Sequence, residues 1–164
     1  VKMLKVKDQL IIESLNKFKG LSHRQETVYS NKKILCINDS KATSFEACSQ
    51  SLSIYNNIYW IVGGKSKKKD NFHLKKFKKK IIKAYIIGKN TSFFKKQIKK
   101  NFPYIVSNNL KNAINKIYKD LKNSKELKNT ILLSPAAASY DQFKNFEERG
   151  FCFKKLILKK IKNV

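Results

Sequence analysis

Four short apolar runs alternate with segments of helical periodicity, and this alternation constrains the fold more strongly than any other feature of the chain. The runs span residues 34–37, 58–62, 84–87 and 130–133, and each has the length and β-branched content of a buried strand. Strands separated by helices form βαβ units, so the sequence predicts an α/β fold with an open, mostly parallel sheet of five or six strands and helices on both faces. Ligands of such sheets bind beyond the carboxyl ends of the strands.

The spacing of apolar residues outside these runs predicts three helices. The clearest is amphipathic, starts behind a cap at Ser107 or Asn108, and carries on one face Leu110, Ala113, Ile114, Ile117, Tyr118 and Leu121. A narrower stripe of Leu74, Phe77 and Ile81 predicts a second helix, whose solvated face would carry the lysines between residues 65 and 80. Residues 1–19 predict a helix that ends at Gly20.

The chain is highly charged, but its chemistry does not favour nucleic-acid recognition. The 164 residues carry a net charge of +26, and lysine supplies nearly all of it, because only Arg24 and Arg149 are arginines. Phosphate clamping and base readout favour the planar fork of arginine. We interpret the excess of lysine, with abundant asparagine and isoleucine, as compositional drift at tolerant surface positions.

The number and spacing of cysteines and histidines, together with the hydropathy, argue against a disulfide-rich, metal-binding or membrane-spanning protein. The three cysteines lie far apart without a Cys-x-x-Cys pair, and the chain has two histidines, so we predict no disulfide framework and no transition-metal site. No stretch reaches the roughly 18 apolar residues of a membrane span, and the N-terminus lacks a signal-peptide apolar region. The sequence therefore predicts a soluble, cytoplasmic chain with one globular domain and a short appendage.

Two loops that follow apolar runs carry groups suited to anions, and each also has a simpler structural interpretation. Residues 38–43 place a carboxylate, an ammonium and two hydroxyls where a strand meets a helix, so freed backbone amides could assist an anion. The same side chains, Asp39, Ser40 and Thr43, are common helix caps. Residues 134–150 form a small-residue turn that lets a ligand approach the backbone, or else a tight turn that buries Phe143 and Phe146.

Gly64-Lys65-Ser66 follows an apolar run and imitates the end of a phosphate-binding P-loop. Such a loop needs a glycine five residues before Gly64, so that its amides turn toward phosphate, and Tyr59 occupies this position. We therefore reject a P-loop here. The chain contains no other Gly-Lys-Ser/Thr sequence and does not resemble an autonomous nucleotide hydrolase.

Four sequence blocks, taken in order, match a known family. They are GLSHR at residues 20–24, NDSKAT at residues 38–43, Gly63-Gly64 with Lys67, and SPAAASYDQFKNFEERG at residues 134–150. In order and spacing they resemble the C-terminal domain of the D-glutamate-adding muramyl ligases, and the last block distinguishes these from sister ligases of the same architecture. The resemblance implies a Rossmann-like domain over residues 20–164, with residues 1–19 as the last helix of a central ATPase domain.

The resemblance also implies a reaction, substrates and cofactors. In this family, which serves peptidoglycan synthesis, ATP phosphorylates the alanyl carboxylate of UDP-N-acetylmuramoyl-L-alanine, and the amine of D-glutamate then attacks the acyl phosphate. The central domain holds the P-loop and the Mg²⁺ ligands, and the N-terminal domain holds the uridine nucleotide. Neither is recognisable in this sequence, so we expect the isolated chain to be inactive, to require both other domains, and to contribute no metal ligand.

Carried over residue by residue, the resemblance implies two groups of site residues. The nucleotide would contact Arg24, Asp39 and Lys41, with Lys41 near the transferring phosphate as the catalytic cation. D-Glutamate would contact Thr43, Lys67, Ser139 and the backbone around Phe146, a mixture of one cation and neutral donors that suits a small dianion. Residues 38–43, Lys67 and Ser139 are accordingly predicted to converge on one edge of the sheet.

Two departures from the family pattern and two alternative functions remain. Ser44 stands where the family usually has asparagine, and Lys68, Lys69 and Asp70 replace a glycine-rich or acidic stretch, which leaves open which lysine of residues 65–69 holds D-glutamate. One alternative is a basic, non-enzymatic module that binds nucleic acid through aromatic residues interleaved with lysines, namely Phe72, Phe77, Phe93 and Phe94. The other is a decayed remnant without function.

Overall fold

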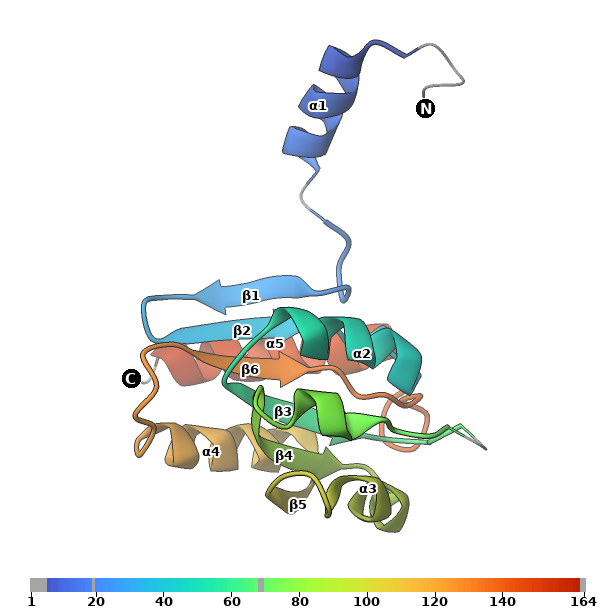
Figure 1. The fold of residues 1–164 in the computed structure, drawn as a ribbon, viewed down its shortest axis with the longest axis vertical. Helices are drawn as coiled ribbons and strands as arrows, with labels where there is room; N and C mark the ends of the chain where they lie inside the picture. The colour runs from blue at the N-terminus through green and yellow to red at the C-terminus, as the bar shows by residue number, and fades with distance from the viewer. Residues whose placement is uncertain (1–5, 19, 68–69, 163–164) are drawn as a thin grey trace.

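The computed structural model describes residues 6–18, 20–67 and 70–162, and these residues form one six-stranded sheet, five α-helices and a short 3₁₀ helix (Figure 1). The strands are β1 (Glu26–Ser30), β2 (Ile34–Asn38), β3 (Ile58–Gly63), β4 (Ile81–Ile87), β5 (Tyr104–Asn108) and β6 (Asn129–Leu133). The helices are α1 (Asp8–Lys17), α2 (Phe45–Ile54), η2 (Leu74–Phe77), α3 (Thr91–Ile98), α4 (Leu110–Leu121) and α5 (Phe146–Lys162).

The strand order across the sheet is β1-β2-β6-β3-β4-β5, and all neighbouring strands are parallel except β1 and β2, which are antiparallel. Leu133 at the end of β6 lies opposite Asn38 of β2 and Ile61 of β3, and Gly63 lies opposite Ile87 of β4. The carboxyl ends of four strands therefore meet at one edge. The predicted open, mostly parallel α/β sheet is confirmed.

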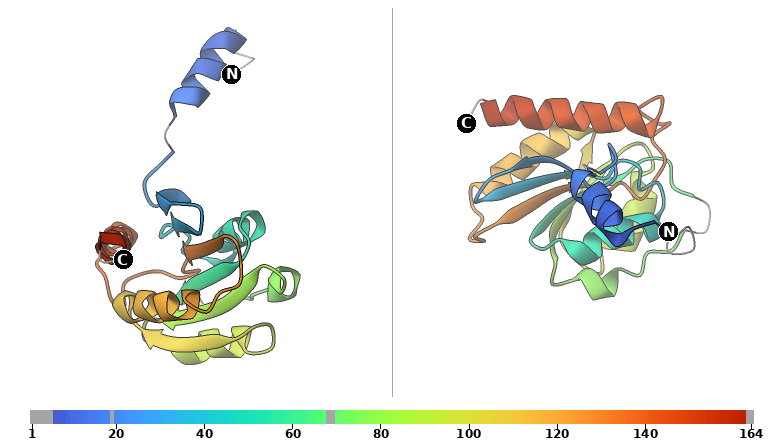
Figure 2. Two further views of the ribbon diagram at one scale, coloured as in Figure 1. Left: turned by 90° about the vertical axis from the view of Figure 1, so that its left-hand side faces the viewer. Right: turned by 90° about the horizontal axis from the view of Figure 1, so that it is seen from above.

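Helices cover both faces of the sheet and bury two hydrophobic cores (Figure 2). One core packs α2, η2 and α3 against the sheet, and the other packs α4 and α5 against the opposite face. Along β3, Ile58, Trp60 and Val62 face the first core, while Tyr59 and Ile61 face the second. A strand covered on both faces is apolar at every position, which explains why β3 was recognisable in the sequence.

The two strands at the edges of the sheet were not predicted. The four predicted apolar runs correspond to β2, β3, β4 and β6, whereas β1 and β5 are missing from that prediction. Both edge strands keep residues exposed or half-buried, so neither contains a continuous apolar run. The predicted amphipathic helix is confirmed as α4, but its cap is Asn109, whose side chain accepts a hydrogen bond from the Asn112 amide (2.9 Å). The predicted cap at Ser107 or Asn108 was thus too early.

The predicted lysine-rich helix is wrong. Its apolar stripe belongs to two different elements, because Leu74 and Phe77 anchor the single turn of η2 and Ile81 begins β4. An i, i+3 pair fits a 3₁₀ turn as well as an α-helix, so the spacing alone could not distinguish them. Lys75, Lys76, Lys78 and Lys79 are exposed, while Lys68 and Lys69 lie outside the described residues.

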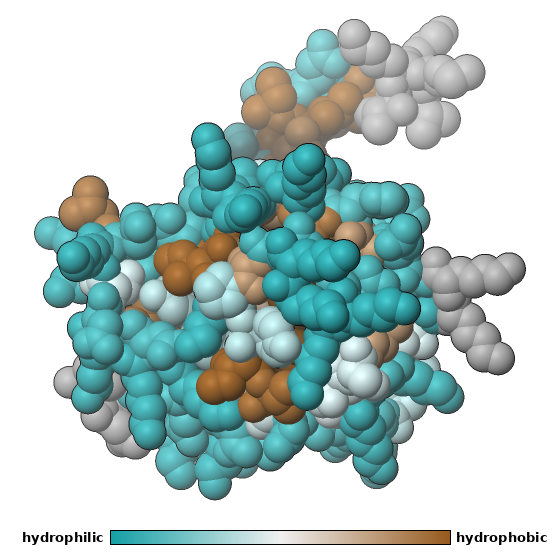
Figure 3. All heavy atoms as spheres, turned by 60° about the horizontal axis from the view of Figure 1, so that its bottom comes forward, coloured by the Kyte–Doolittle hydropathy of each residue, from teal (hydrophilic) through white to brown (hydrophobic). Residues whose placement is uncertain are grey.

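The hydrophilic surface is broad and is not organised around aromatic residues. Figure 3 shows mostly hydrophilic side chains, interrupted by separate apolar areas, on the side that carries the β5 edge. The aromatic residues that motivated the nucleic-acid alternative pack instead into the first core, with Phe72, Phe77 and Phe94 buried and Phe93 half-buried. They are therefore not available to stack on bases.

Helix α1 extends away from the sheet, as Figures 1 and 2 show. None of its residues is buried, and Leu10, Ile12 and Leu15 are more than half exposed. The N-terminal helix is confirmed for Asp8–Lys17 and ends before Gly20, where φ is +78°. No helix among the described residues is long and apolar enough to cross a membrane.

Candidate functional site

The loops that follow β2, β3 and β6 are joined to one another by backbone hydrogen bonds. The Asp39 amide donates to Leu133 O (2.8 Å), and the Gly63 amide donates to Pro135 O (2.9 Å). Lys65 and Ala138 form an antiparallel bridge, with N to O distances of 2.9 and 3.1 Å. The structure thus brings together the three loops that the sequence assigned to a site, at the carboxyl edge where α/β sheets bind ligands.

Glycines allow this close approach of the loops. Gly64 has φ +135°, and a Cβ atom built there would lie 2.4 Å from Ala138 O. Gly63 has φ +128°, and its Cβ would lie 2.1 Å from Ile87 O. The Gly63-Gly64 pair therefore lets three chain segments pack against one another.

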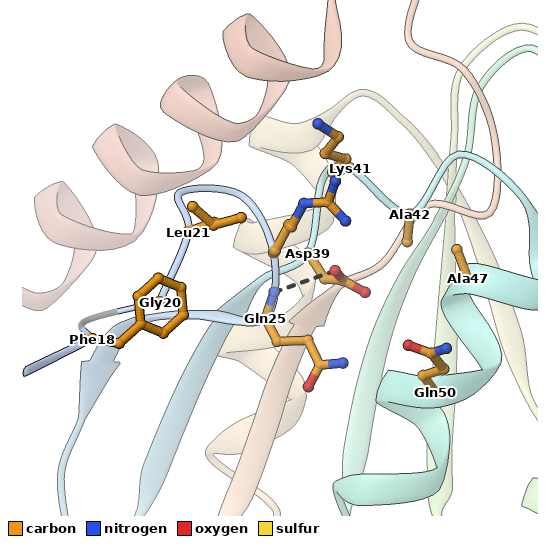
Figure 4. Close-up of a pocket in the computed structure, with 10 residues that line it drawn as sticks. Phe18, Gly20, Leu21, Gln25, Asp39, Lys41, Ala42, Ala47 and Gln50 are labelled. Atoms are coloured by element: carbon orange, nitrogen blue, oxygen red, sulfur yellow. Dashed lines mark hydrogen bonds between the residues drawn. The ribbon is translucent and has the colours of Figure 1, made fainter. Parts of the chain in front are cut away.

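A cavity of about 410 Å³ opens beside the β2 loop (Figure 4). Its wall contains the three residues predicted to contact a nucleotide, Arg24, Asp39 and Lys41. The rest of the wall comes from the segment after α1, from the β2 loop and from α2, and consists of Phe18, Gly20, Leu21, Gln25, Ala42, Ala47 and Gln50. Two exposed cations, Arg24 and Lys41, and a half-open shape suit an anionic ligand.

Asp39 is buried in the cavity wall, where the protein occupies its carboxylate. Oδ2 accepts from the Ser51 hydroxyl (2.6 Å) and the Ser134 hydroxyl (2.8 Å), and Oδ1 accepts from the Gln25 amide (3.3 Å). Burial raises the pKa of Asp39, although these hydrogen bonds and the charge of Arg24 act in the opposite direction. The carboxylate therefore fixes the turn that carries Arg24.

The donor set of the cavity does not fit a magnesium ion. Mg²⁺ needs near-octahedral oxygen ligands, usually carboxylates with room for several waters. The carboxylate of Asp39 already accepts three hydrogen bonds, and no group of three or more His, Cys, Asp or Glu in the described part of the chain could hold a metal.

Lys41 lies between the two predicted groups of site residues. Its side chain is exposed, and Nζ lies 4.8 Å from the centroid of the Phe146 ring, a cation–π arrangement. Its backbone amide donates to His23 O (3.0 Å). The ammonium predicted to meet phosphate is thus placed beside the residue predicted to contact D-glutamate.

The capping interpretation of residues 38–43 is wrong. The N-cap of α2 is Ser44, whose hydroxyl accepts from the Ala47 amide (3.4 Å), and Asp70 Oδ2 accepts from the Phe45 amide (3.0 Å). Asp70, from the loop after β3, therefore satisfies a second amide of the same helix end. Thr43 is half-buried in the turn before the cap, so its hydroxyl is not the capping group.

The remaining residues predicted to hold D-glutamate lie on two loops. Ser139 is buried at the end of the small-residue turn, where its carbonyl accepts from the amides of Gln142 and Phe143. Phe146 is half-buried at the first position of α5. Lys67 is exposed, and its carbonyl accepts from the Asp70 amide (3.3 Å). The structure brings the Ser139 and Phe146 turn next to the β2 loop, and it leaves the Lys67 side chain toward solvent.

Sequence reasoning missed a buried polar cluster beneath the cavity. His23 is 3% exposed, with Nδ1 2.9 Å from Asn38 Nδ2. Glu26 Oε2 accepts from both the His23 amide and Asn38 Nδ2 (3.1 Å each). Burial lowers the pKa of His23 even though the charge of Glu26 raises it, which favours the neutral imidazole. Because Asn38 Nδ2 is a donor, His23 Nδ1 accepts this hydrogen bond.

The contacts of Arg149 also could not be predicted from the sequence. This residue of α5 is 1% exposed, and its guanidinium donates to Ser40 and Ala137. The rarity of arginine was the signal that could have drawn attention to this residue. Only two of the 37 basic residues are arginines, which suggests that these positions use the planar fork of the guanidinium.

The fold and the site together define a class of protein. A mostly parallel α/β sheet with its anion-suited loops gathered at one carboxyl edge is consistent with a Rossmann-like muramyl ligase domain. No protein-family model matches the chain.

Comparison with known proteins identifies the particular relatives. The chain is 43% identical over 152 residues to the UDP-N-acetylmuramoylalanine--D-glutamate ligase of Wolbachia sp. subsp. Brugia malayi (strain TRS), which covers 93% of this chain and 30% of that protein. The ligase of the same name from Bartonella henselae is 43% identical over 150 residues, covering 92% of this chain and 32% of that protein. That from Rhizobium meliloti is 40% identical over 143 residues, covering 87% and 31%.

The chain is therefore homologous to a portion of the UDP-N-acetylmuramoylalanine--D-glutamate ligases, and the resemblance found in the four sequence blocks is confirmed. It spans between 30% and 32% of the length of these three relatives.

Proposed function

We propose that this chain is the D-glutamate-binding portion of an ATP-dependent ligase that adds D-glutamate to UDP-N-acetylmuramoyl-L-alanine in peptidoglycan synthesis. Residues 20–164 would be its C-terminal domain, and residues 1–19 would end its central ATPase domain. The observation that carries the proposal is the grouping of Arg24, Asp39 and Lys41 in one cavity, beside the turn of Ser139 and Phe146, in a chain homologous to such ligases.

The cavity would hold part of the nucleotide. Arg24 offers a planar cation, and Asp39, held by three hydrogen bonds, keeps the turn behind Arg24 in place. Lys41 would supply a compact positive charge to the phosphoryl group as it moves from ATP to the alanyl carboxylate. The amide of Lys41 is anchored to His23 O, so its backbone needs little rearrangement when the nucleotide binds.

The neighbouring turn would hold D-glutamate. Thr43 and Ser139 offer hydroxyls, the backbone around Phe146 offers amides at the N-terminus of a helix, and Lys67 offers a cation. The amine of D-glutamate would attack the acyl carbon, phosphate would leave, and the nitrogen would lose a proton as the amide forms. ATP and Mg²⁺ would be held mainly by the central domain, and the uridine nucleotide by the N-terminal one. ATP and UDP-linked precursors are cytoplasmic molecules, so the proposal assigns the chain to the cytoplasm.

The test is amide formation from UDP-N-acetylmuramoyl-L-alanine, D-glutamate and ATP. We expect none from the isolated chain, and we expect activity when it is joined to the N-terminal and central domains of a relative. Lys41→Ala in the joined enzyme should lower kcat about 100-fold, because one transition-state contact to developing charge is lost. Lys122→Ala, at the far end of α4, is the control and should leave kcat unchanged. ATP hydrolysis by the isolated chain, or an inactive joined enzyme, would refute the proposal.

A further inference from the structure

Arg149 is the most deeply buried of the Lys, Arg, Asp and Glu side chains in the described residues. Its side chain is 1% exposed, and Nε donates to Ser40 Oγ (3.0 Å), Nη1 to Ala137 O (3.0 Å) and Nη2 to Ser40 O (2.7 Å). The ion pairs found among those residues involve His23, Lys83 and Lys154, and none of them includes Arg149. The direct partners of the buried cation are therefore carbonyl and hydroxyl dipoles, and the charge of Asp141 also acts on it without an ion pair.

Such an arrangement is not explained by stability. Burial lowers the pKa of Arg149 to about 10, which still leaves the guanidinium charged at neutral pH. Transferring a charge from water into the protein interior costs free energy, and replacing buried ionic groups by well-packed apolar residues is often neutral or stabilising. A lysine-rich chain that places one of its two arginines here uses the geometry of the fork rather than its charge alone.

The contacts of Arg149 join the two halves of the candidate site. We call residues 38–43 the nucleotide loop and residues 134–146 the D-glutamate turn, after their proposed roles. Ser40 lies between Asp39 and Lys41 in the nucleotide loop, and Ala137 lies two residues before Ser139 in the D-glutamate turn. The Ser40 hydroxyl accepts from Arg149 and donates in turn to Phe146 O (2.8 Å). Arg149 thus contacts both loops directly and reaches the first residue of α5 through the Ser40 hydroxyl.

Gly150 adds a second close contact from the same helix. A Cβ atom at Gly150 would lie 2.1 Å from His23 Nδ1, so α5 packs against His23 at a distance that only glycine permits. His23 O in turn accepts from the Lys41 amide (3.0 Å). The start of α5 therefore supports the nucleotide loop from two sides.

We propose that Arg149 is a positioning residue that fixes the nucleotide loop and the D-glutamate turn relative to each other. The structural part of this proposal, that Arg149 fixes the two segments, is based on its hydrogen bonds to Ser40 and Ala137. The functional part, that this fixation affects catalysis, rests on the proposed function. Lysine cannot replace arginine in this role, because a single ammonium cannot hold Ser40 Oγ, Ser40 O and Ala137 O in the fixed geometry of a planar fork.

Hydrogen exchange on the chain tests the structural part. In Arg149→Lys and Arg149→Met, amides of residues 39–43 and 136–140 should exchange about tenfold faster than in the wild type, equivalent to about 1.4 kcal/mol. Amides of β3 should keep their wild-type rates. Lys155→Met, an exposed position on the same helix, is the control and should change neither segment.

Three results would overturn the structural part. The first is equally faster hydrogen exchange at every amide, as a general loss of stability would give. The second is faster exchange in only one of the two segments, and the third is unchanged exchange. Should both arginine variants fail to fold, Ser40→Ala replaces them, because it removes the shared hydroxyl and keeps the guanidinium. The same two segments should then exchange faster, and an unchanged Ser40→Ala pattern would count against the proposal.

Kinetics of the joined ligase test the functional part. Arg149→Lys should raise the KM values for ATP and D-glutamate together, each about tenfold, whereas a residue of one subsite should raise only one. Wild-type KM values in the Arg149→Lys enzyme would refute the positioning role in catalysis. An inactive wild-type joined enzyme would instead refute the proposed function, and the hydrogen-exchange result would stand independently.

Discussion

The loop after β2 and the loop after β3 present their polar groups in opposite ways. In the first loop Asn38, Asp39 and Ser40 are buried, and each side chain is hydrogen-bonded to a distant part of the chain. In the second loop Lys65 and Lys67 are exposed. That loop is attached near its two ends, by the pairing of Lys65 with Ala138 and by the hydrogen bond from the Phe45 amide to Asp70.

This difference indicates that the two halves of the proposed site are preorganised for ligand binding to different degrees. The nucleotide loop is fixed by its own buried contacts, so a ligand meets a backbone already in place. The exposed Lys67 side chain would instead lose rotamer freedom if it binds D-glutamate as proposed, at a cost of up to about 2 kcal/mol. The comparison predicts that changes at the anchors will reduce stability, whereas changes at Lys67 will reduce affinity for one substrate.

The largest expected effect comes from removing the anchor of the second loop. Gly64→Ala should lower the free energy of unfolding by about 3 kcal/mol, because a Cβ would meet Ala138 O at 2.4 Å and φ is +135°. Gly20→Ala is the matched control, since Gly20 also has positive φ, at +78°, but a Cβ there meets nothing within 4 Å. Its loss should be about 1 kcal/mol. Equal losses in urea unfolding would show that the contact with Ala138 does not anchor the loop.

Lys67→Ala should act on binding and not on stability. In the joined ligase it should raise the KM for D-glutamate about 30-fold, because loss of a hydrogen bond to a charged group costs about 2 kcal/mol. The KM for ATP and the unfolding midpoint should stay the same. Lys65→Ala is the control, because the backbone of Lys65 pairs with Ala138 whatever its side chain. If Lys65→Ala raises the KM for D-glutamate instead, the wrong lysine has been chosen.

The smallest expected effect is the pH dependence that His23 gives to the first loop. Burial lowers the pKa of His23 below its ordinary value of 6.5, with Glu26 and Glu147 acting against burial and Lys154 acting with it. The stability contributed by the neutral imidazole is present above about pH 6.5 and is lost as the pH falls through the lower pKa of the folded state. The loss includes the hydrogen bond from Asn38 Nδ2, worth about 1 kcal/mol.

Urea unfolding between about pH 5 and pH 7.5 measures this dependence. His23→Asn should flatten it, because asparagine tolerates the positive φ of +63° at this position and does not titrate. His73→Asn, at an exposed position beside η2, is the control and should retain the wild-type slope. A wild-type slope in His23→Asn would assign the pH dependence to other groups.

Strands buried on both faces could be predicted from the sequence, whereas the strands at the edges could not. β3 is buried at all six positions and therefore forms a continuous apolar run. β1 and β5 have a neighbouring strand on one side, and most of their residues are exposed or half-buried, so their composition resembles that of a loop. The same limit explains the error at Leu74, Phe77 and Ile81, because a stripe of three apolar residues fits more than one local structure.

The fold class, the four central strands and the order of the blocks that mark the carboxyl-edge loops could be predicted from the sequence, because these depend on local periodicity and short motifs. The partners of the polar groups in those loops became visible only in the folded chain. Asp39 meets Ser51 and Ser134, 12 and 95 residues away, and Arg149 meets Ser40 across 109 residues. Such contacts leave no periodic signal, because the residues become neighbours only when the sheet has assembled and α5 has packed against it.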